Sequence, residues 1–255
     1  MFNAEYFTYD GKPSQDFGLI IADFDNSNVK ETDAFSPELS LLKAPGQIRF
    51  FHGKVEYSTA PTCEFSVISE RPIDAGSRSV ILSWLVGRKE FLPLEFTGGD
   101  NVDYVYFCVF TAAKTIWVNG QCHGFRLTAE FDSQFARAPE TTISVAGTQT
   151  GVKIMNNSDI DDYVYPLVEF TGPGVDIVNT TDDPGRHFIF ENLEAGERIT
   201  VDNELRHISS SISGPKLENF TSKKWLRLKK GANYLNINSA GTVTITCPSY
   251  KMVGY

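Results

Sequence analysis

Strict two-residue alternation of apolar and polar side chains is the feature that most limits what this chain can fold into. Phe125–Asp132 (FRLTAEFD) alternates without interruption, and the same period recurs at Thr242–Cys247 and Arg198–Asp202. Successive side chains of a β-strand point to opposite faces, so this pattern predicts strands with one buried and one wet face. Shorter runs of the same kind lie at Leu226–Lys229 and Leu235–Asn238. The sequence therefore predicts an all-β protein.

Turn-forming residues separate these runs at short intervals. Asn119-Gly120 lies between Thr115–Val118 and Phe125–Phe131, and this combination predicts a β-hairpin. Glycine and proline mark further turns. These are Gly98–Asp100, Gly172–Gly174, Asp183–Gly185, Lys230-Gly231 and Ala240-Gly241.

One segment has helical spacing instead. Within residues 74–87 the apolar side chains of Val80, Ile81, Trp84 and Leu85 fall on one face of a helix, and Gly87 follows as a stop signal. We predict a single amphipathic helix of about three turns. It should lie across a sheet, with its tryptophan facing the core.

The composition changes at Asp132–Thr142 (DSQFARAPETT), where the aromatic-rich first half of the chain ends. This segment has no clear period, which favours a linker. A chain of 255 residues can form two domains of ordinary size. We expect residues 1–136 to form a first β-domain, which contains the one helix. Residues 137–255, with about eight short strand-like runs, should form a second antiparallel sandwich or jelly roll.

The charge and hydropathy of the chain exclude several classes of protein. A net charge of −9 argues against tight nucleic-acid binding, which requires clustered lysine and arginine to neutralise phosphates. No run approaches the ~18 apolar residues of a membrane helix, and the opening residues do not resemble a signal peptide. We expect the cysteines to be free, buried thiols. They are Cys63, Cys108, Cys122 and Cys247.

Motifs that would indicate catalysis or nucleotide binding are absent from the sequence. The acidic clusters Ser158–Asp162 and Thr181–Gly185 could supply oxygen ligands for calcium, but solvated loops are the simpler interpretation. We therefore assign no catalytic, cofactor-binding or metal-binding residues and do not expect an enzyme. A hydrolase that uses dispersed carboxylates stays as an alternative. The histidines are scattered, at His52, His123, His187 and His207.

Two tryptophans lie in strand-like runs and have two possible roles. Trp117 and Trp225 could each close a core or stack on a sugar, and the core is the favoured interpretation for both. If Trp225 or Tyr165 were exposed, the second domain could instead bind carbohydrate.

Several segments resemble the distal tail proteins (Dit) of siphophages, the bacteriophages with long non-contractile tails. The segments follow the order of that family over essentially the whole chain, and their order and spacing are more specific than any one of them. They are Phe7–Ile21 (FTYDGKPSQDFGLII), Ile48–Gly53, Trp84-Leu85 within the helix, Gly124–Ala136, Asn156–Phe170 and Leu228–Ile237.

This resemblance implies a virion structural protein of the tail tip, synthesised in the cytoplasm of the bacterial host. The N-terminal domain, residues 1–136, would be a β-sandwich with one helix. Six copies of it would form a ring, alone or as two rings back to back. The ring would join the major tail tube protein to the tail-tip protein and leave a channel for DNA in transit. The C-terminal domain would be a galectin-like β-sandwich that holds receptor-binding or baseplate proteins. The resemblance implies no cofactor and no membrane contact.

Overall fold

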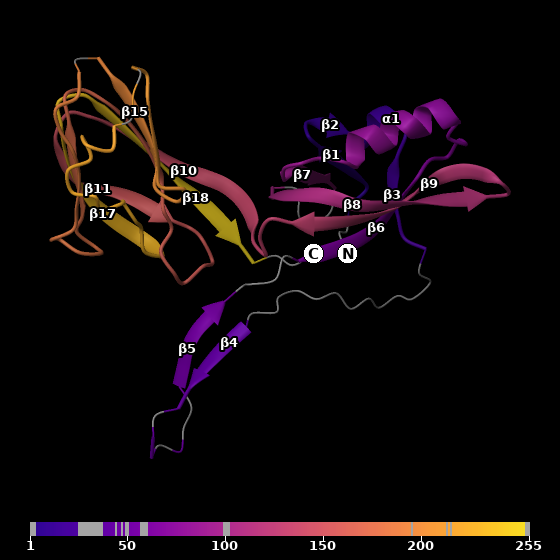
Figure 1. Cartoon of the computed structure of the whole chain (residues 1–255), viewed down its shortest axis with the longest axis horizontal. Helices are drawn as coiled ribbons and strands as arrows, with labels where there is room; N and C mark the ends of the chain where they lie inside the picture. The colour runs from indigo at the N-terminus through magenta and orange to yellow at the C-terminus, as the bar shows by residue number, and fades with distance from the viewer. Residues whose placement is uncertain are drawn as a thin grey trace. The chain divides into compact units, whose positions relative to one another are not determined.

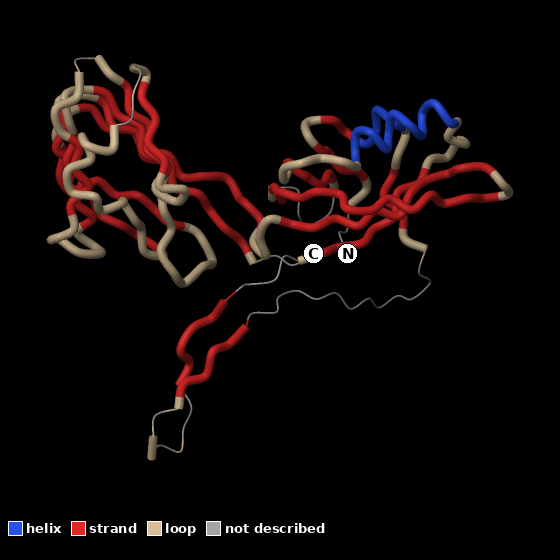
Figure 2. The backbone as a smooth tube through the Cα atoms, viewed as in Figure 1, coloured by secondary structure: helices blue, strands red, loops and turns tan. Residues whose placement is uncertain are grey.

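The chain folds into two compact units, which are described separately. The first runs from the N-terminus to Ala136 and includes Met252, and the second is Arg137–Lys251. Strands dominate both units (Figure 2), and α1 (Ala75–Leu85) is the one α-helix in the described part of the chain. The prediction of an all-β protein with one helix is confirmed. The computed structural model describes residues 4–24, 38–43, 45–46, 48, 51–56, 61–98, 103–194, 196–212, 214 and 216–252.

A curved antiparallel sheet forms the body of the first unit, in the order β3-β6-β9-β8-β7-β1-β2. It wraps around its own core, since the amide of Ile21 in β3 donates to the carbonyl of Glu5, next to β1, at 2.9 Å. The strands are β1 (Tyr6–Tyr9), β2 (Lys12–Pro13), β3 (Ile20–Ala22), β6 (Thr62–Ile68), β7 (Leu92–Thr97), β8 (Val105–Val118) and β9 (Gln121–Phe131), with a 3-10 turn η1 (Ser14–Phe17) after β2.

A further hairpin, β4 (Glu38–Leu42) and β5 (Phe51–Glu56), forms a two-stranded sheet of its own. Two sequence predictions lie partly outside the described residues. Arg49 and Phe50 belong to the segment Ile48–Gly53, and Gly99 and Asp100 to the turn after β7.

The predicted hairpin at Asn119-Gly120 is confirmed. Val118 pairs with Gln121 across the turn that joins β8 to β9. Asn119 and Gly120 have φ angles of 50° and 78°, as the two central residues of a type I′ turn require. Asparagine and glycine tolerate this left-handed conformation better than other residues, so the sequence determines where the hairpin reverses.

Helix α1 begins at an aspartate cap. The Asp74 carboxylate accepts hydrogen bonds from the amides of Gly76 at 2.8 Å and Ser77 at 3.0 Å, which satisfies donors that have no partner inside the helix. Ile81 and the two residues Trp84 and Leu85 are buried. Val80, which the sequence placed on the same face, is 57% exposed. The spacing of three and four residues from Ile81 defines the buried stripe, and Val80 lies about 100° away from Ile81.

Helix α1 lies along the sheet of the first unit (Figure 1), and Trp84 attaches it there. Its indole nitrogen donates to the carbonyl of Tyr9 at 3.0 Å. Its ring stacks on Phe7, at 5.7 Å between centroids, and on Phe17, at 4.5 Å. The predicted core-facing position of Trp84 is confirmed. The other large buried rings among the described residues of this unit are Tyr9, Phe65, Phe96, Tyr106, Phe110, Phe125 and Phe131.

The second unit is a sandwich of two sheets whose inner faces share one core. One sheet has the order β16-β15-β12-β18-β10 and the other β11-β17-β13-β14. The strands are β10 (Ala136–Ala146), β11 (Gln149–Asn156), β12 (Leu167–Thr171), β13 (Val175–Asn179), β14 (His187–Phe190), β15 (Arg198–Asp202), β16 (His207–Ser210), β17 (Gly231–Ser239) and β18 (Thr242–Lys251).

Two sequence predictions for this unit are wrong. Asp132–Thr142 is not a linker throughout, because β10 begins within it. β10 pairs with β18, and hydroxyl groups meet across the wet face at Thr142 and Thr246, 3.1 Å apart. A strand with a polar outer face shows little periodicity in apolar residues. Leu226–Lys229 is not a strand either, since its one ladder contact is an isolated bridge from Leu228 to Val164.

The four cysteines are free, as predicted. Cys108, Cys122 and Cys247 are buried, whereas Cys63 is partly exposed. Burial raises the pKa of the Cys247 thiol to about 12, so this thiol stays protonated and unreactive at neutral pH. Within the described ranges, no helix combines the length and the apolar character that crossing a membrane would require.

Trp84 should contribute far more to stability than the exposed Trp117. We expect Trp84→Ala to lower the free energy of unfolding by about 3–5 kcal/mol, because it empties the space between helix and sheet. The matched change Trp117→Ala should cost less than about 1 kcal/mol. Calorimetric unfolding of the two variants tests this. Equal losses would contradict the anchoring role of Trp84.

Candidate interaction site on the second unit

The most structured polar cluster of the chain lies where the segment after β13 meets the segment before β17. Asn179 ends β13, and its side-chain amide donates to the carbonyl of Arg227 at 3.0 Å and to the side chain of Asn233 at 2.9 Å. The carbonyl of Asn179 accepts from the amides of Asp182 and Asp183. The turn at residues 180–186 is therefore folded back onto residues 224–229.

Asp182 is the centre of this cluster. Its carboxylate accepts hydrogen bonds from Arg227 at 2.7 Å and from the Tyr163 hydroxyl at 2.9 Å, and Lys229 lies 3.5 Å away. The Arg227 guanidinium also lies over the Tyr163 ring, 3.9 Å from its centroid. The side chain of Asp182 is only 3% exposed. The prediction of a solvated loop at Thr181–Gly185 is therefore wrong for Asp182.

The other acidic cluster is also partly structural. Ser158 is buried, and its hydroxyl accepts from the amide of Tyr250 at 3.1 Å. Asp161 is 93% exposed and pairs with Lys230 at 2.9 Å. Among the residues that the structure describes, no three histidine, cysteine or acidic side chains are grouped so as to hold a metal ion.

The pKa of Asp182 reflects this environment. Burial by itself raises the pKa of the carboxyl, but hydrogen bonds from Arg227 and Tyr163 and the charges of Arg227 and Lys229 outweigh it. The pKa therefore lies below its ordinary value. A depressed pKa in the folded state means that the ionised pair stabilises the fold above about pH 4. That contribution is lost as the pH falls toward the folded-state pKa.

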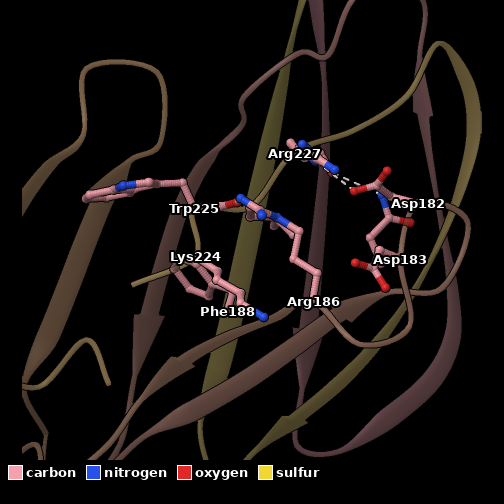
Figure 3. A pocket seen from close by; sticks show the side chains of 9 residues that line it. Asp182, Asp183, Arg186, Phe188, Lys224, Trp225 and Arg227 are labelled. Carbon is pink, nitrogen blue, oxygen red and sulfur yellow. Dashed lines mark hydrogen bonds and ion pairs between the residues drawn. The ribbon is translucent and has the colours of Figure 1, made fainter. Parts of the chain in front are cut away.

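A small hollow lies beside this cluster, between Arg186, Lys224 and Trp225 (Figure 3). Arg186 donates from Nη2 to the carbonyl of Trp225 at 3.1 Å. Its Nε is buried and has no hydrogen-bond partner. The hollow encloses about 10 Å³, which is roughly the space that one water needs. It is too small for a substrate but suits a single oxygen atom.

Trp225 is half-buried and packs on Phe220, at 4.9 Å between ring centroids. The prediction that Trp225 contributes to the core is therefore only partly correct, because its side chain contacts buried Phe220 but stays partly exposed. Tyr165, the other candidate for sugar stacking, is also partly buried. Lys223 and Lys224, which precede Trp225 in the sequence, are the signal that could have indicated a basic, aromatic surface here. No sequence signal identified Arg186, which comes to the hollow from the preceding turn.

A wider groove of about 570 Å³ lies elsewhere on this unit, open to solvent beside β13, β14 and the β17–β18 turn. Asp176, Glu191 and Asn238 are among the residues that line it. His187 lies 2.9 Å from the Asp176 carboxylate. Of the scattered histidines, His123 contacts the carbonyl of Ser69 at 3.2 Å.

The prediction that Trp117 lies in the core is wrong. It is 56% exposed and lies at the tip of the β8–β9 hairpin next to Val118, which is 47% exposed. The Arg78 guanidinium lies 5.3 Å from the centroid of the Trp117 ring. The last residues of β8 pair with the first residues of β9, and Trp117 opposes Cys122 there. The apolar run at residues 116–118 continues to the tip, but Trp117 and Val118 lie outside the core.

Breaking the ion pair of Asp182 should cost much more stability than breaking an exposed one, because it leaves a buried charge unpaired. We expect Asp182→Asn to lower the free energy of unfolding by about 3 kcal/mol at pH 7, because it leaves Arg227 without its counter-charge. The difference from the wild type should shrink as the pH falls below about 4. Urea unfolding across this pH range measures it. Asp161→Asn removes the same charge at the surface and should have almost no effect.

Comparison with known proteins places the chain in a family. Residues 2–133 match the family model for a phage tail protein N-terminal domain, and residues 135–247 match that for a phage tail C-terminal domain. The uncharacterized SPbeta prophage-derived protein YomH of Bacillus subtilis is 24% identical over 242 residues, which cover 92% of this chain and 93% of that protein.

Solved structures show the same fold. The Dit protein (gp 19.1) of phage SPP1 superposes with a TM-score of 0.68 at 15% identity, over 96% of this chain and 98% of that chain. A chain of the phage P2 baseplate in its activated conformation with Ca superposes with a TM-score of 0.54 at 10% identity, over 96% and 97%. With both domain models matched in order along the sequence, the chain belongs to this family of phage tail proteins, and it has the fold of the SPP1 Dit protein.

Proposed function

We propose that this chain is the subunit of a hexameric ring that joins the tail tube to the proteins of the tail tip. The observation that carries the proposal is the match of both tail-protein domains together with a Dit fold over 96% of the chain. The SPP1 relative is described as a paradigm of the hub adsorption apparatus in phages that infect Gram-positive bacteria. A hub needs a rigid scaffold with interfaces, and that role requires no catalytic site.

Exposed apolar side chains on the first unit support a self-association surface. A ring of identical subunits uses two different faces of each subunit, so both must carry contact residues. Trp117 and Val118 project at the tip of the β8–β9 hairpin, and Val80 is exposed on α1. Exposed tryptophan next to aliphatic residues is typical of interface centres. We assign the hairpin tip to a contact between neighbouring subunits.

The remaining parts of the proposal concern the channel and the second unit. A net charge of −9 suits a channel through which DNA passes, because a cationic wall would retain phosphates. The second unit, which we propose is galectin-like, would hold baseplate or receptor-binding proteins. A carbohydrate-binding role has weaker support, since Trp225 packs on Phe220 and its hollow admits about one water.

The mass of the protein in solution tests the ring. We expect light scattering behind a sizing column to give six times 28.4 kDa, or twice that mass for two rings back to back. Trp117→Ser should shift the population toward monomer, because it removes an apolar contact at the interface. Leu205→Ser, at a position that is 77% exposed on the second unit, is the matched control and should leave the mass unchanged. A monomeric wild type at high concentration would contradict assembly of the free ring.

A further inference from the structure

We propose that Arg186, Lys223, Lys224 and Trp225 form a docking site for a carboxylate-bearing, apolar segment of another tail-tip protein. The inference rests on the proposed function and assigns a surface and a partner chemistry to the second unit. We refer to these four residues as the basic-aromatic site. They lie on the two segments that Asn179 and Asp182 hold together. Arg186, Lys224 and Trp225 line the hollow of Figure 3, and Lys223 directly precedes Lys224 in the chain.

The three cations of this site carry uncompensated charge. Each donates to a backbone carbonyl: Arg186 to Trp225, Lys224 to Gly185, and Lys223 to Leu217. Among the described residues, none of the three lies within ion-pair distance of a carboxylate. Arg227 and Lys229, a few residues along the chain, are neutralised by Asp182. A chain with 32 acidic and 23 basic residues thus keeps three free positive charges in one place.

Arg186 also has a donor that needs an acceptor. Its Nε is buried against the hollow and makes no hydrogen bond, and a buried donor without a partner costs free energy. A carboxylate oxygen in the hollow would accept this hydrogen bond as a charge-assisted one, which is stronger than a bond to water. The nearby Lys224 ammonium would add to the attraction, since both residues line the hollow.

The surroundings favour a protein segment over a charged polymer. Trp225 is half-exposed, Leu217 is 54% exposed, and Phe220 lies under the Lys223 ammonium, 5.9 Å from ring centroid to nitrogen. Tryptophan and arginine are the residues that most often dominate protein interfaces. Asp183 lines the same hollow and is exposed, so it would repel a polymer with a phosphate on every unit. A single carboxylate flanked by apolar side chains fits these features better.

Calorimetric titration of the full chain tests the site with two capped peptides, Ac-Ala-Leu-Glu-Ala-NH2 and its Gln analogue. We expect the Glu peptide to bind at least tenfold more tightly than the Gln peptide at constant ionic strength, because only the carboxylate can neutralise Arg186 and Lys224. Arg186→Gln should weaken binding of the Glu peptide at least tenfold. Lys224→Gln, an exposed position that does not support the fold, should also weaken it.

Two control variants distinguish the specific hydrogen bond of Arg186 from a general effect of positive charge. Arg198→Gln removes an exposed positive charge from β15 and should leave binding unchanged. Arg186→Lys keeps the charge but lacks Nε, and it should bind as weakly as Arg186→Gln. No binding of the Glu peptide, equal binding of the two peptides, or unchanged affinity in both Arg186→Gln and Lys224→Gln would overturn the proposal.

Two further outcomes would assign the surface to a different occupant. Tighter binding of glycerol 3-phosphate than of the Glu peptide would indicate a phosphate ligand. A lower mass of Arg186→Gln in light scattering would indicate a second copy of this chain. Either result overturns the proposal. If the wild type forms no ring but its peptide binding still depends on Arg186, the docking site stands and the proposed ring fails.

Discussion

The packing of aromatic rings between β layers is the interaction on which both units depend. In the first unit Trp84 lies against Phe7 and Phe17 and so holds the one described α-helix on the sheet. In the second unit Phe220 stacks on Phe190 at 4.7 Å with an angle of 16° between the rings. Phe220 belongs to no strand and joins the ladder only through an isolated bridge to Phe190. Ring stacking and two backbone hydrogen bonds, from the amide of Glu191 to Asn219 and from the amide of Thr221 to Ile189, together attach this segment to β14.

This anchoring connects the core to the surface of the second unit. Phe220 is fully buried, and Lys223, Lys224 and Trp225 follow it within five positions. Two contacts therefore position these three residues: Phe220 anchors them to the core, and the turn at Asp182 packs against the same segment. A buried ion pair contributes little net stability compared with apolar packing, but it holds the groups around it in one arrangement. Here it fixes the turn that brings Arg186 to the hollow.

The sequence predicts those parts of the fold that depend on local pattern. Two-residue alternation locates β9, β15 and β18, and Asn119-Gly120 locates the hairpin because few other residues adopt its left-handed turn. Apolar alternation does not predict burial where burial depends on a partner that is distant in the sequence. Trp117 lies in an apolar run at the end of β8, but its side chain is exposed beyond the core. β10 shows little apolar periodicity because its outer face makes hydroxyl contacts with β18.

The candidate site was harder to predict than the fold, for a related reason. In the sequence, Asp182 lies in a polar segment with the pattern of an exposed turn. It becomes a buried anion only because Arg227, 45 residues further along the chain, packs against it in the fold. The structures that share this fold are 10–15% identical to the chain, so the fold tolerates replacement of most side chains. Core alternation is enough to maintain a two-domain scaffold of this kind, whereas the choice of partner depends on individual side chains in its turns. Partner specificity in such a scaffold should therefore reside in turn residues such as Arg186, whose replacement leaves the strand pattern intact.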